Sequence, residues 1–445
     1  MARTERGATQ ETVRRHNLAA LLGHLHRYGP TSRARLTRLL GLNRATIGDL
    51  VDDLVSRGLV DEQSEPERAA RGRPSKVVAA SPKRCQALAV QVGVDAVEVA
   101  LVGLGGPTVW RGRVAISKAA DRTVAHVLGV VTRLAVPKLE AVAGGVVGVG
   151  VAVPGSVSPD GRVVNFAPNL GWHQVPLAQL LRDRLGFEGS VQIGNDANLG
   201  AMAEHSRGVG IRTSDLIYLH AEVGVGGGII TGGQMLTGAR GYAGEVGHMQ
   251  VNPTGLPCHC GARGCWETEV GEDALVRRAG LHPGGRAKVE QVLANARRGD
   301  PTCLAAVNET ARWIGIGLVN MVSSMDPEMV ILGGVFEDIL ELARPTLGEQ
   351  LNTTSRYTRP SGVALMKPKF DGSSVLMGAA ELGLQRVLSD PSTVPVGSSA
   401  AGTCAPPQAS SFMSGQTGRE VALSRDVSIA DAVDAGAAAS TRQTA

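Results

Sequence analysis

The feature of this chain that most constrains its fold is a cluster of one histidine and three cysteines within eighteen residues. His248, Cys258, Cys260 and Cys265 form an H-x9-C-x-C-x4-C pattern. Four such ligands make one of the closed tetrahedral shells that Zn²⁺ prefers in structural sites. Glycines among the cysteines permit tight turns. We therefore predict a structural zinc that organises residues 241–267, a segment called the metal loop from here on.

Other interpretations of the cysteines are weaker. Free Cys is among the most buried residue types, but clustering beside glycine and histidine favours a metal site over three buried thiols. A disulfide would leave the third thiol unpaired, and the polar, charged N-terminus does not resemble a secretory signal. The neighbouring His259 could replace His248 as the fourth ligand, and the sequence leaves that choice open.

Two glutamates flank the predicted metal site. Glu245 precedes His248 by three residues, and Glu267 follows Cys265 by two. A metal bound to His248 and Cys265 would therefore hold both carboxylates in one place. A histidine that binds a metal through one ring nitrogen keeps its other N–H to donate. A polyhydroxy ligand such as a sugar suits this set, although both glutamates could instead orient the metal ligands or face solvent.

Basic charge gathers at the N-terminal end of the chain. Residues 1–85 contain 16 Lys and Arg against 9 Asp and Glu, a balance of +7, whereas the whole chain carries +4 and the remainder therefore −3. A basic end on a slightly acidic body indicates a nucleic-acid-binding module attached to another domain.

That end has the pattern of three helices and a hairpin. Four leucines recur at helical spacing between positions 18 and 25, before Gly29-Pro30 ends the first helix. A second helix begins after a cap at Thr31 or Ser32, and a third begins after Asn43. The short turn between these two helices predicts a helix-turn-helix. A hairpin with a basic tip at residues 68–76 follows and would serve as a wing.

The third helix would read DNA with its first turn, where Arg44 is the best candidate for a guanine edge or a phosphate. Three aspartates in this helix would be repelled by phosphate, so they must face away or the helix must insert only by its tip. A three-helix protein-binding module is the alternative. The predicted DNA contacts are Arg33, Arg35, Asn43, Arg44, Thr46, Arg71 and Arg73.

After a linker near residues 81–83, apolar strands alternate with helices. The expected strands are 87–92, 97–104, 146–154, 187–193, 215–219, 226–230 and 329–332, with helices at 124–142 and 305–325. This order predicts mixed α/β sheets with helices on their faces, in two lobes. The most apolar run, 141–154, is well short of the ~20 residues needed to span a bilayer.

The motifs of the metal loop resemble those of the ROK family of repressors, open reading frames and sugar kinases. EVGH at 245–248 is similar to the family's E-x-G-H, and CHCGARGCWE at 258–267 to its C-x-C-G-x-x-G-C-x-E. The resemblance covers about residues 12–388. It implies a two-lobed α/β body with the actin-like ATPase fold of sugar kinases and heat-shock chaperones, behind an N-terminal winged helix-turn-helix domain.

The implied domains are the winged helix-turn-helix at 12–80, a small lobe at 85–198 and a large lobe at 199–388 that holds the zinc site. The last helix is expected to return to the small lobe. Residues 389–445 are rich in Ala, Ser, Pro and Gly without periodicity, which predicts a disordered tail.

The resemblance also assigns a sugar site in a cleft between the lobes. PNL at 168–170 and NDAN at 195–198 are similar to family loops, and Asp196 stands where family kinases have the base that takes a proton from the sugar hydroxyl. Without a motif, Asn and Asp in loops are more often turn formers than ligands. The expected sugar shell is Asn169, Asn195, Asp196, Glu245, His248 and Glu267.

Both phosphate-binding motifs depart from the family pattern. QVGVD at 91–95 stands where kinases have D-x-G-G-T, and EVGVGGG at 222–228 where they resemble G-T-G-x-G-G-G. These changes place acids and a Cβ where backbone should approach phosphate. ATP and Mg²⁺ are therefore not expected, and the sugar would be bound without turnover.

Together these features predict a sugar-responsive transcriptional regulator, a repressor of carbohydrate metabolism, rather than an enzyme. Its partners would be double-stranded DNA, a sugar effector and further copies of the chain in a dimer or tetramer, in the cytoplasm and without a membrane. The alternative is an ATP-dependent, glucokinase-like sugar kinase with a DNA-binding appendage. A protein-binding scaffold would leave the polar shell unexplained.

Overall fold

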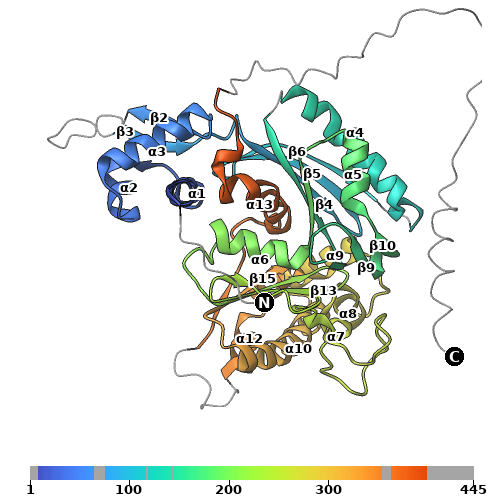
Figure 1. Cartoon of the computed structure of the whole chain (residues 1–445). Helices are drawn as coiled ribbons and strands as arrows, with labels where there is room; N and C mark the ends of the chain where they lie inside the picture. Colours follow the sequence, from blue (N-terminus) through green and yellow to red (C-terminus); the bar gives the residue numbers. More distant parts are fainter. Residues whose placement is uncertain (1–8, 65–75, 117–118, 143–144, 353–361, 398–445) are drawn as a thin grey trace, which may run out of the picture. The chain divides into compact units, whose positions relative to one another are not determined.

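The computed structural model describes residues 9–64, 76–116, 119–142, 145–352 and 362–397 (Figure 1). These parts contain an N-terminal module (residues 9–64 and 76–80) and a body that begins at residue 81. The predicted wing residues Arg71 and Arg73, and residues 398–445 of the predicted tail, lie outside the described residues. Within the described ranges, no helix has the length and apolar character needed to cross a membrane.

The N-terminal module has the element order of a winged helix-turn-helix. Its sheet has the antiparallel order β1-β3-β2. Four leucines of the first helix are at most 1% exposed, so the predicted apolar face forms the module's core. The elements are α1 (Gln10–Tyr28), β1 (Thr31–Ser32), α2 (Arg33–Leu40), α3 (Arg44–Ser56), β2 (Val60–Ser64) and β3 (Lys76–Ala80).

The helix ends of this module follow the predicted capping residues. The side chain of Ser32, rather than that of Thr31, caps α2 by accepting from the Arg35 amide at 3.4 Å. Asn43 caps α3 by accepting from the Thr46 amide at 2.9 Å. Gly41 has the left-handed φ of 65° that ends α2, so the turn into α3 needs only three residues.

The first sheet of the body has the order β11-β7-β4-β5-β6. Strands β11, β7 and β4 pair in parallel, and β5 pairs antiparallel with both β4 and β6. Large side chains of β4 face the core that includes α4 (Val124–Ala141) and α5 (Leu177–Leu185), whereas its alanines face α13 (Ser374–Ser389). The strands are β4 (Gln86–Val92), β5 (Ala96–Gly103), β6 (Thr108–Ala115), β7 (Val146–Val153) and β11 (Ser190–Asn195).

The second sheet repeats this pattern in the order β14-β13-β12-β15-β16. Strands β12, β15 and β16 pair in parallel, and β13 pairs antiparallel with both β12 and β14. One face packs on the largest apolar cluster, formed with the helices that follow the metal loop. The other face packs against α6 (Asp196–Arg207). The strands are β12 (Leu216–Ala221), β13 (Val225–Thr231), β14 (Gln234–Met235), β15 (Met329–Gly334) and β16 (Ala364–Met366).

The helices of the second half cover one face of its sheet. They are α7 (Trp266–Val270), α8 (Glu272–Arg278), α9 (Arg286–Arg297), α10 (Pro301–Met325), α11 (Val335–Leu342) and α12 (Arg344–Asn352). The smaller elements are β8 (Ser156–Val157), β9 (Val164–Ala167), β10 (Trp172–Val175) and the 3₁₀ turns η1 (Ala119–Arg122), η2 (Pro168–Leu170), η3 (Val246–His248) and η4 (Pro391–Thr393). Strands β8, β9 and β10 form a third, small sheet.

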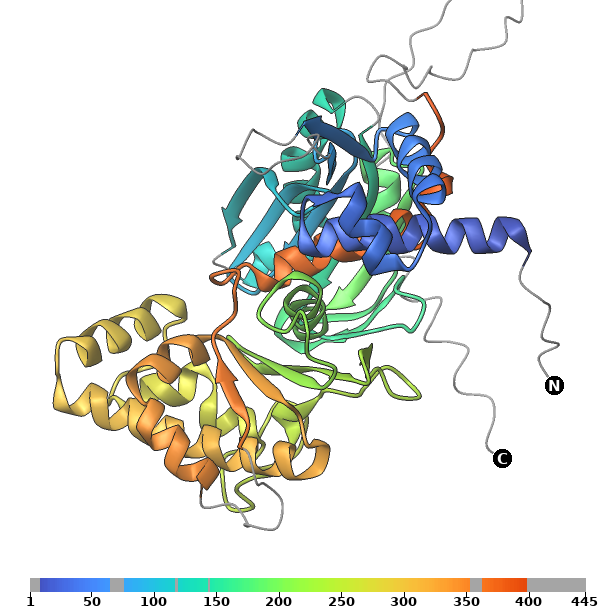
Figure 2. The ribbon, with the colours of Figure 1, turned by 90° about the vertical axis from the view of Figure 1, so that its left-hand side faces the viewer.

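Helix α6 lies between α13 and the second sheet, as Figures 1 and 2 both show. Its first residue follows the carboxyl end of β11 directly, so the N-terminus of α6 stands where that parallel strand ends. Polar loops at the carboxyl ends of strands are the usual place for a ligand site in such sheets.

Most predicted elements are present, and the differences have local causes. The strand predicted from residue 187 begins at Ser190, because Gly186 ends α5 in a left-handed conformation and residues 187–189 lead away from it. Helix α10 begins at Pro301, before the predicted residue 305, because the Asp300 side chain accepts from the Cys303 amide at 2.8 Å.

The described part of the predicted tail is folded against the N-terminal module. The Arg57 guanidinium donates to the backbone oxygens of Ser392 at 3.0 Å and Val394 at 2.5 Å. The Gly397 amide donates to the Ser56 oxygen at 3.0 Å. The expectation of disorder from residue 389 therefore does not describe residues 390–397, whose backbone is held by α3 and the residue that follows it.

Candidate functional site

The structure brings the four predicted metal ligands together. His248, Cys258, Cys260 and Cys265 each offer one ligand atom, and these atoms lie within 4.8 Å of one another. The Sγ atoms of Cys260 and Cys265 are 3.6 Å apart, as are Cys258 Sγ and His248 Nδ1. Ligand atoms around a tetrahedral zinc would be separated by about 3.6–3.8 Å, so these residues fit that ion. His259 does not belong to the described cluster.

Hydrogen bonds between backbone groups of the metal loop help to determine its conformation. The amide of Cys258 donates to the Ala262 oxygen at 2.8 Å, and that of Gly264 to the Leu256 oxygen at 2.8 Å. Gly264 has φ +69°, and an added Cβ there would lie 1.5 Å from the Asn252 oxygen. Only glycine can occupy this position, which explains why the cysteine motif contains one.

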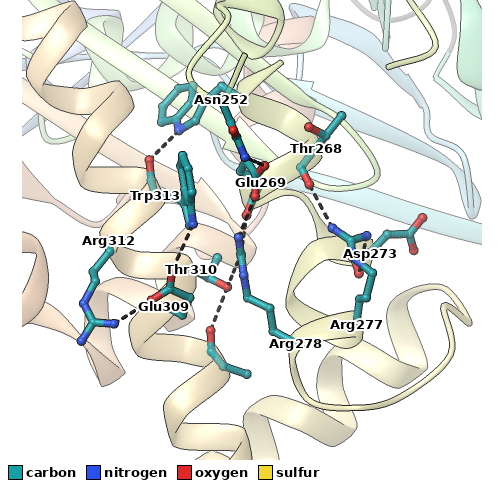
Figure 3. Close-up of polar contacts among 12 residues, drawn as sticks. Asn252, Thr268, Glu269, Asp273, Arg277, Arg278, Glu309, Thr310, Arg312 and Trp313 are labelled. Atoms are coloured by element: carbon teal, nitrogen blue, oxygen red, sulfur yellow. Dashed lines mark hydrogen bonds and ion pairs between the residues drawn. The ribbon is translucent and has the colours of Figure 1, made fainter. Parts of the chain in front are cut away.

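The metal loop is attached to the helices behind it through polar contacts (Figure 3). The Asn252 side chain donates to Glu269 at 2.8 Å, and Arg278 donates to the other oxygen of Glu269 at 2.9 Å. Arg278 also donates to the hydroxyl of Thr310 on α10 at 3.1 Å. The fully buried Trp266, directly after the last cysteine, donates from its indole to the Trp313 oxygen at 2.8 Å. The loop is therefore fixed to α7, α8 and α10.

The imidazole of His248 lies between the two flanking glutamates. Its Nδ1 faces Cys258 and is 3.6 Å from a Glu267 oxygen, whereas its Nε2 is 4.0 Å from a Glu245 oxygen. A metal held through Nδ1 would leave the N–H of Nε2 on the side of Glu245. Gly247 allows this arrangement, because an added Cβ would lie 2.2 Å from the Val225 oxygen of β13.

Loops from both sheets meet beside Glu267. Asn169, in η2, and Glu267, in α7, approach the same glycine in the turn between β12 and β13. An added Cβ at Gly224 would lie 3.6 Å from Asn169 Nδ2 and 3.3 Å from Glu267 Oε2. The side-chain amide of Asn169 and the carboxylate of Glu267 therefore both lie next to Gly224 in this turn.

Asp196 joins the same group of polar side chains. Burial raises its pKa to about 6, with the charges of Glu222 and Glu245 adding to the rise and His220 opposing it. One carboxylate oxygen accepts from the Ala197 amide at 2.7 Å. A carboxyl group with this pKa can accept or release a proton near neutral pH.

Asn195 is engaged with backbone groups. Its side-chain oxygen accepts from the Asn198 amide at 3.0 Å and caps α6, and its Nδ2 donates to the Gly155 oxygen at 3.1 Å. An amide nitrogen has two hydrogens, so one remains for a ligand. The geometry gives Asn195 a clear part in fixing the N-terminus of α6.

Charged residues that the sequence did not single out surround the second phosphate motif. His220, at the end of β12, lies 3.2 Å from a Glu222 oxygen. Burial raises the pKa of Glu272, and although Arg286, 3.0 Å away, lowers it, the charges of Glu222 and Asp95 add to the rise. The sequence signals for this cluster are the acid at the start of EVGVGGG and the acid at the end of QVGVD, whereas His220, Glu272 and Arg286 lie outside both motifs.

The predicted DNA contacts fall into two groups. Arg35, Asn43 and Arg44 are exposed and Thr46 is half-buried, at the turn and the first turns of α2 and α3. Arg33 instead forms ion pairs within the module, at 2.5 Å to Glu62 and 2.8 Å to Asp52.

Two of the three aspartates of α3 are also paired. Asp52 binds Arg33, and Asp53 binds Arg14 and Arg57, each at 2.7 Å. The negative charge of Asp52 and Asp53 is therefore partly neutralised within the module, whereas Asp49 is exposed.

The two mixed five-stranded sheets, with α6 and α13 between them, define the actin-like fold of sugar kinases, which confirms the predicted fold class. A family model described as "ROK family" matches residues 87–386. The chain belongs to the ROK family.

Three relatives illustrate this relationship. The xylose repressor of Caldicellulosiruptor bescii is 29% identical over 374 residues, which are 81% of this chain and 93% of that protein. A ROK family transcriptional regulator, a homologue of the E. coli MLC protein, has TM-score 0.69 at 23% identity over 85% of this chain and 97% of its own. A ROK family glucokinase from Streptomyces griseus, solved with glucose and AMPPNP, has TM-score 0.60 at 30% identity over 67% of this chain and 99% of its own.

Proposed function

We propose that this protein is a sugar-responsive transcriptional repressor whose ROK body binds a sugar without phosphorylating it. The observation that carries the proposal is that one chain combines an N-terminal module with the element order of a winged helix-turn-helix and a ROK body, and that it aligns with a xylose repressor over 93% of that repressor's length. The repressor covers 81% of this chain, whereas the glucokinase structure covers 67% of it.

The N-terminal module is suited to bind double-stranded DNA. Arg35 and Arg44 are exposed, and the acids behind them are paired with arginines. A helix-turn-helix places the N-terminal residues of its second helix against base edges, which here are Arg44 and Thr46. Such modules bind two half-sites as a dimer, so a homodimer is part of the proposal.

The polar group beside the metal loop is suited to a sugar. Asp196, Glu245 and Glu267 supply acceptors for hydroxyl groups, whereas Asn169 and the Nε2–H of His248 supply donors. A sugar carries several hydroxyls that both donate and accept, so it can satisfy this mixed set. Asn195 would contribute the remaining hydrogen of its amide.

A structural zinc would hold two members of this group in place. His248, Cys258, Cys260 and Cys265 would bind the ion, and His248 and Glu267 would then have fixed positions relative to each other. Zinc with four protein ligands has no open position for substrate, so its contribution is stability and orientation.

The phosphate side of the body is acidic, which argues against ATP. Glu222, Glu272 and Asp95 lie close together. Burial is the main cause of the raised pKa of Glu272, and the charges of Glu222 and Asp95 add to that rise. The nearby cations, His220 and Arg286, already pair with Glu222 and Glu272. A triphosphate would meet like charges where phosphoryl transfer needs cations.

A sugar kinase with a DNA-binding module is the second candidate, and one observation favours it. The pKa of Asp196, raised to about 6 by burial, is suited to a general base at neutral pH. Such a residue would take the proton of the attacking hydroxyl if ATP were bound beside it.

Two assays separate these candidates. A thermal-shift screen of hexoses, pentoses and amino sugars should identify a ligand, because binding to the folded state raises its apparent stability. The same sugar should then give no phosphorylated product with ATP and Mg²⁺. Phosphorylation that disappears in Asp196→Asn would overturn the proposal in favour of the kinase.

A further inference from the structure

Three buried polar or charged side chains join the N-terminal module to the body. His26 of α1, Glu381 of α13 and Arg207 at the end of α6 are 3%, 5% and 7% exposed. Nε2 of His26 lies 2.9 Å from one Glu381 oxygen, and Nε of Arg207 donates to the other at 2.6 Å. The Gly105 amide donates to Nδ1 of His26 at 2.9 Å. With Nδ1 accepting, Nε2 carries the hydrogen that is donated to Glu381.

Glu381 is the common partner in this group. Burial by itself raises the pKa of its carboxyl, but His26 and Arg207 outweigh that effect and lower the pKa to about 2. The carboxylate is therefore charged and depends on both partners. Separating a buried charge from its partner is strongly unfavourable, so α1, α6 and α13 are tied together at one point.

Helix α6 connects this point to the proposed sugar site. It contains twelve residues, from Asp196 to Arg207, and is about 18 Å long. An added Cβ at Gly378 of α13 would lie 1.9 Å from the Leu199 oxygen of α6. One at Gly228 of β13 would lie 2.4 Å from the Ala197 oxygen. Contacts this close leave α6 little freedom to move without α13.

Helix α13 in turn holds the N-terminal module through the segment that follows it. Arg57 binds the backbone oxygens of Ser392 and Val394, and Arg15 lies 3.6 Å from Asp390. The His26–Glu381 contact is therefore a second connection between the N-terminal module and α13, in addition to the contacts of Arg57 and Arg15 with residues 390–394. Figures 1 and 2 show α1 beside α13 in both views.

The same junction leaves room for α1 to move. A cavity of about 720 Å³ lies beside α1 and is lined by His26 and Glu381 as well as by Met202 and His205 of α6 and Met235 of β14. Because the cavity leaves this side of α1 only partly packed, the contact between His26 and Glu381 at the cavity wall helps to fix the position of α1.

We propose that Glu381 is the positioning residue through which the state of the sugar site reaches the DNA-binding module. The inference rests on the proposed function. A sugar that binds Asp196 better in one arrangement of α6 favours that arrangement, and Arg207 and Glu381 carry the difference to His26 and α1. A ligand shifts such an equilibrium only through its differential affinity for the two states.

Hydrogen exchange of the full-length chain, with and without sugar, tests this coupling. The probes are D-xylose, D-glucose and N-acetyl-D-glucosamine, of which the one that protects the metal loop is used throughout. In the wild type, that sugar should also change amide exchange in α1. In Glu381→Gln, it should still protect the metal loop, but its effect on α1 should fall about fivefold or more.

Two further variants make the result specific. His26→Leu removes the contact with the N-terminal module and keeps the Arg207–Glu381 pair, so it should fold and should also lose the response of α1. Glu98→Gln is the control, because Glu98 is a carboxylate held by two arginines, Arg111 and Arg113, on the first sheet. Its response should equal that of the wild type.

The outcomes distinguish the inference from the proposed function. If the metal loop is protected but α1 responds in Glu381→Gln and His26→Leu as it does in the wild type, the coupling does not pass through Glu381. If all three sugars leave the metal loop of the wild type unprotected, the proposed sugar site is wrong and this inference fails with it. A loss of response in Glu98→Gln equal to that in Glu381→Gln would also overturn the proposal.

Discussion

At the scale of single residues, Asp196 holds a carboxyl group whose environment opposes its ionisation. Its pKa is raised from 3.8 to about 6, first by burial. The folded state therefore binds the proton more tightly than the unfolded state, so this group's contribution to the free energy of unfolding falls as pH rises from about 4 to 6. Above that range the full penalty remains, at most about 3 kcal/mol.

Asp196→Asn should therefore make the protein more stable at pH 7.5 while removing sugar binding. The amide keeps an oxygen for the Ala197 N–H and has no charge to bury. Urea unfolding should show a gain of at most about 3 kcal/mol at pH 7.5 that shrinks toward pH 4. A variant that is no more stable than the wild type at pH 7.5 would show that burial does not disfavour the charge.

The metal site gives a second prediction at this scale. Metal analysis after dialysis should find about one zinc per chain, and Cys260→Ala should lose most of it together with sugar affinity, because metal binding and local folding are coupled. Cys303→Ala is the matched control, since Cys303 is a cysteine of α10 outside the cluster. Equal zinc in both variants would rule out the assigned ligands.

At the scale of elements, α2 and α3 separate residues that we propose to contact DNA from residues that hold the module together. Arg44→Ala should weaken binding to duplex DNA by about 1–3 kcal/mol and leave the free energy of unfolding nearly unchanged, because Arg44 is exposed. Arg33→Ala should instead lower stability by about 1–2 kcal/mol, because Arg33 pairs with Glu62 and Asp52. DNA titrations and urea melts of both variants check this. If Arg44→Ala instead lowered stability and Arg33→Ala weakened DNA binding, the proposal that α3 reads DNA through Arg44 would be wrong.

Elements whose signals are local could be predicted from the sequence. The caps Ser32 and Asn43, the leucine pattern of α1 and the apolar run of β7 each act within a few residues. The cluster of His248 and three cysteines was predictable for the same reason, since its members lie within eighteen residues. The pairing of Arg33 could not be predicted, because Glu62 reaches it only after β2 has paired with β3 in the folded module.

At the scale of the whole molecule, contacts between distant residues escaped prediction. His26 and Glu381 are 355 positions apart, and neither lies in a motif. Residues 390–397 look like the start of a disordered tail by composition, yet α3 and Arg57 hold their backbone. In both cases the partner is supplied by the fold, so no local pattern marks it.

The proposed coupling between sugar binding and DNA binding depends on how the parts of the whole molecule are connected. The two sheets of the body meet at α6, and α13 links α6 to the N-terminal module. A sugar bound beside Asp196 could therefore change the position of the DNA-reading helices. Coupling of about 1–3 kcal/mol would change DNA affinity roughly 5- to 150-fold.

The most direct test of the central claim is the affinity of the full-length protein for DNA with and without its sugar. A labelled duplex, selected from a random pool by the wild-type protein, would be titrated by fluorescence anisotropy at fixed salt, since phosphate contacts make binding salt-dependent. The account predicts a Kd that shifts about 5- to 150-fold with the stabilising sugar, without ATP and without any phosphorylated product. A Kd that is the same with and without that sugar would contradict it.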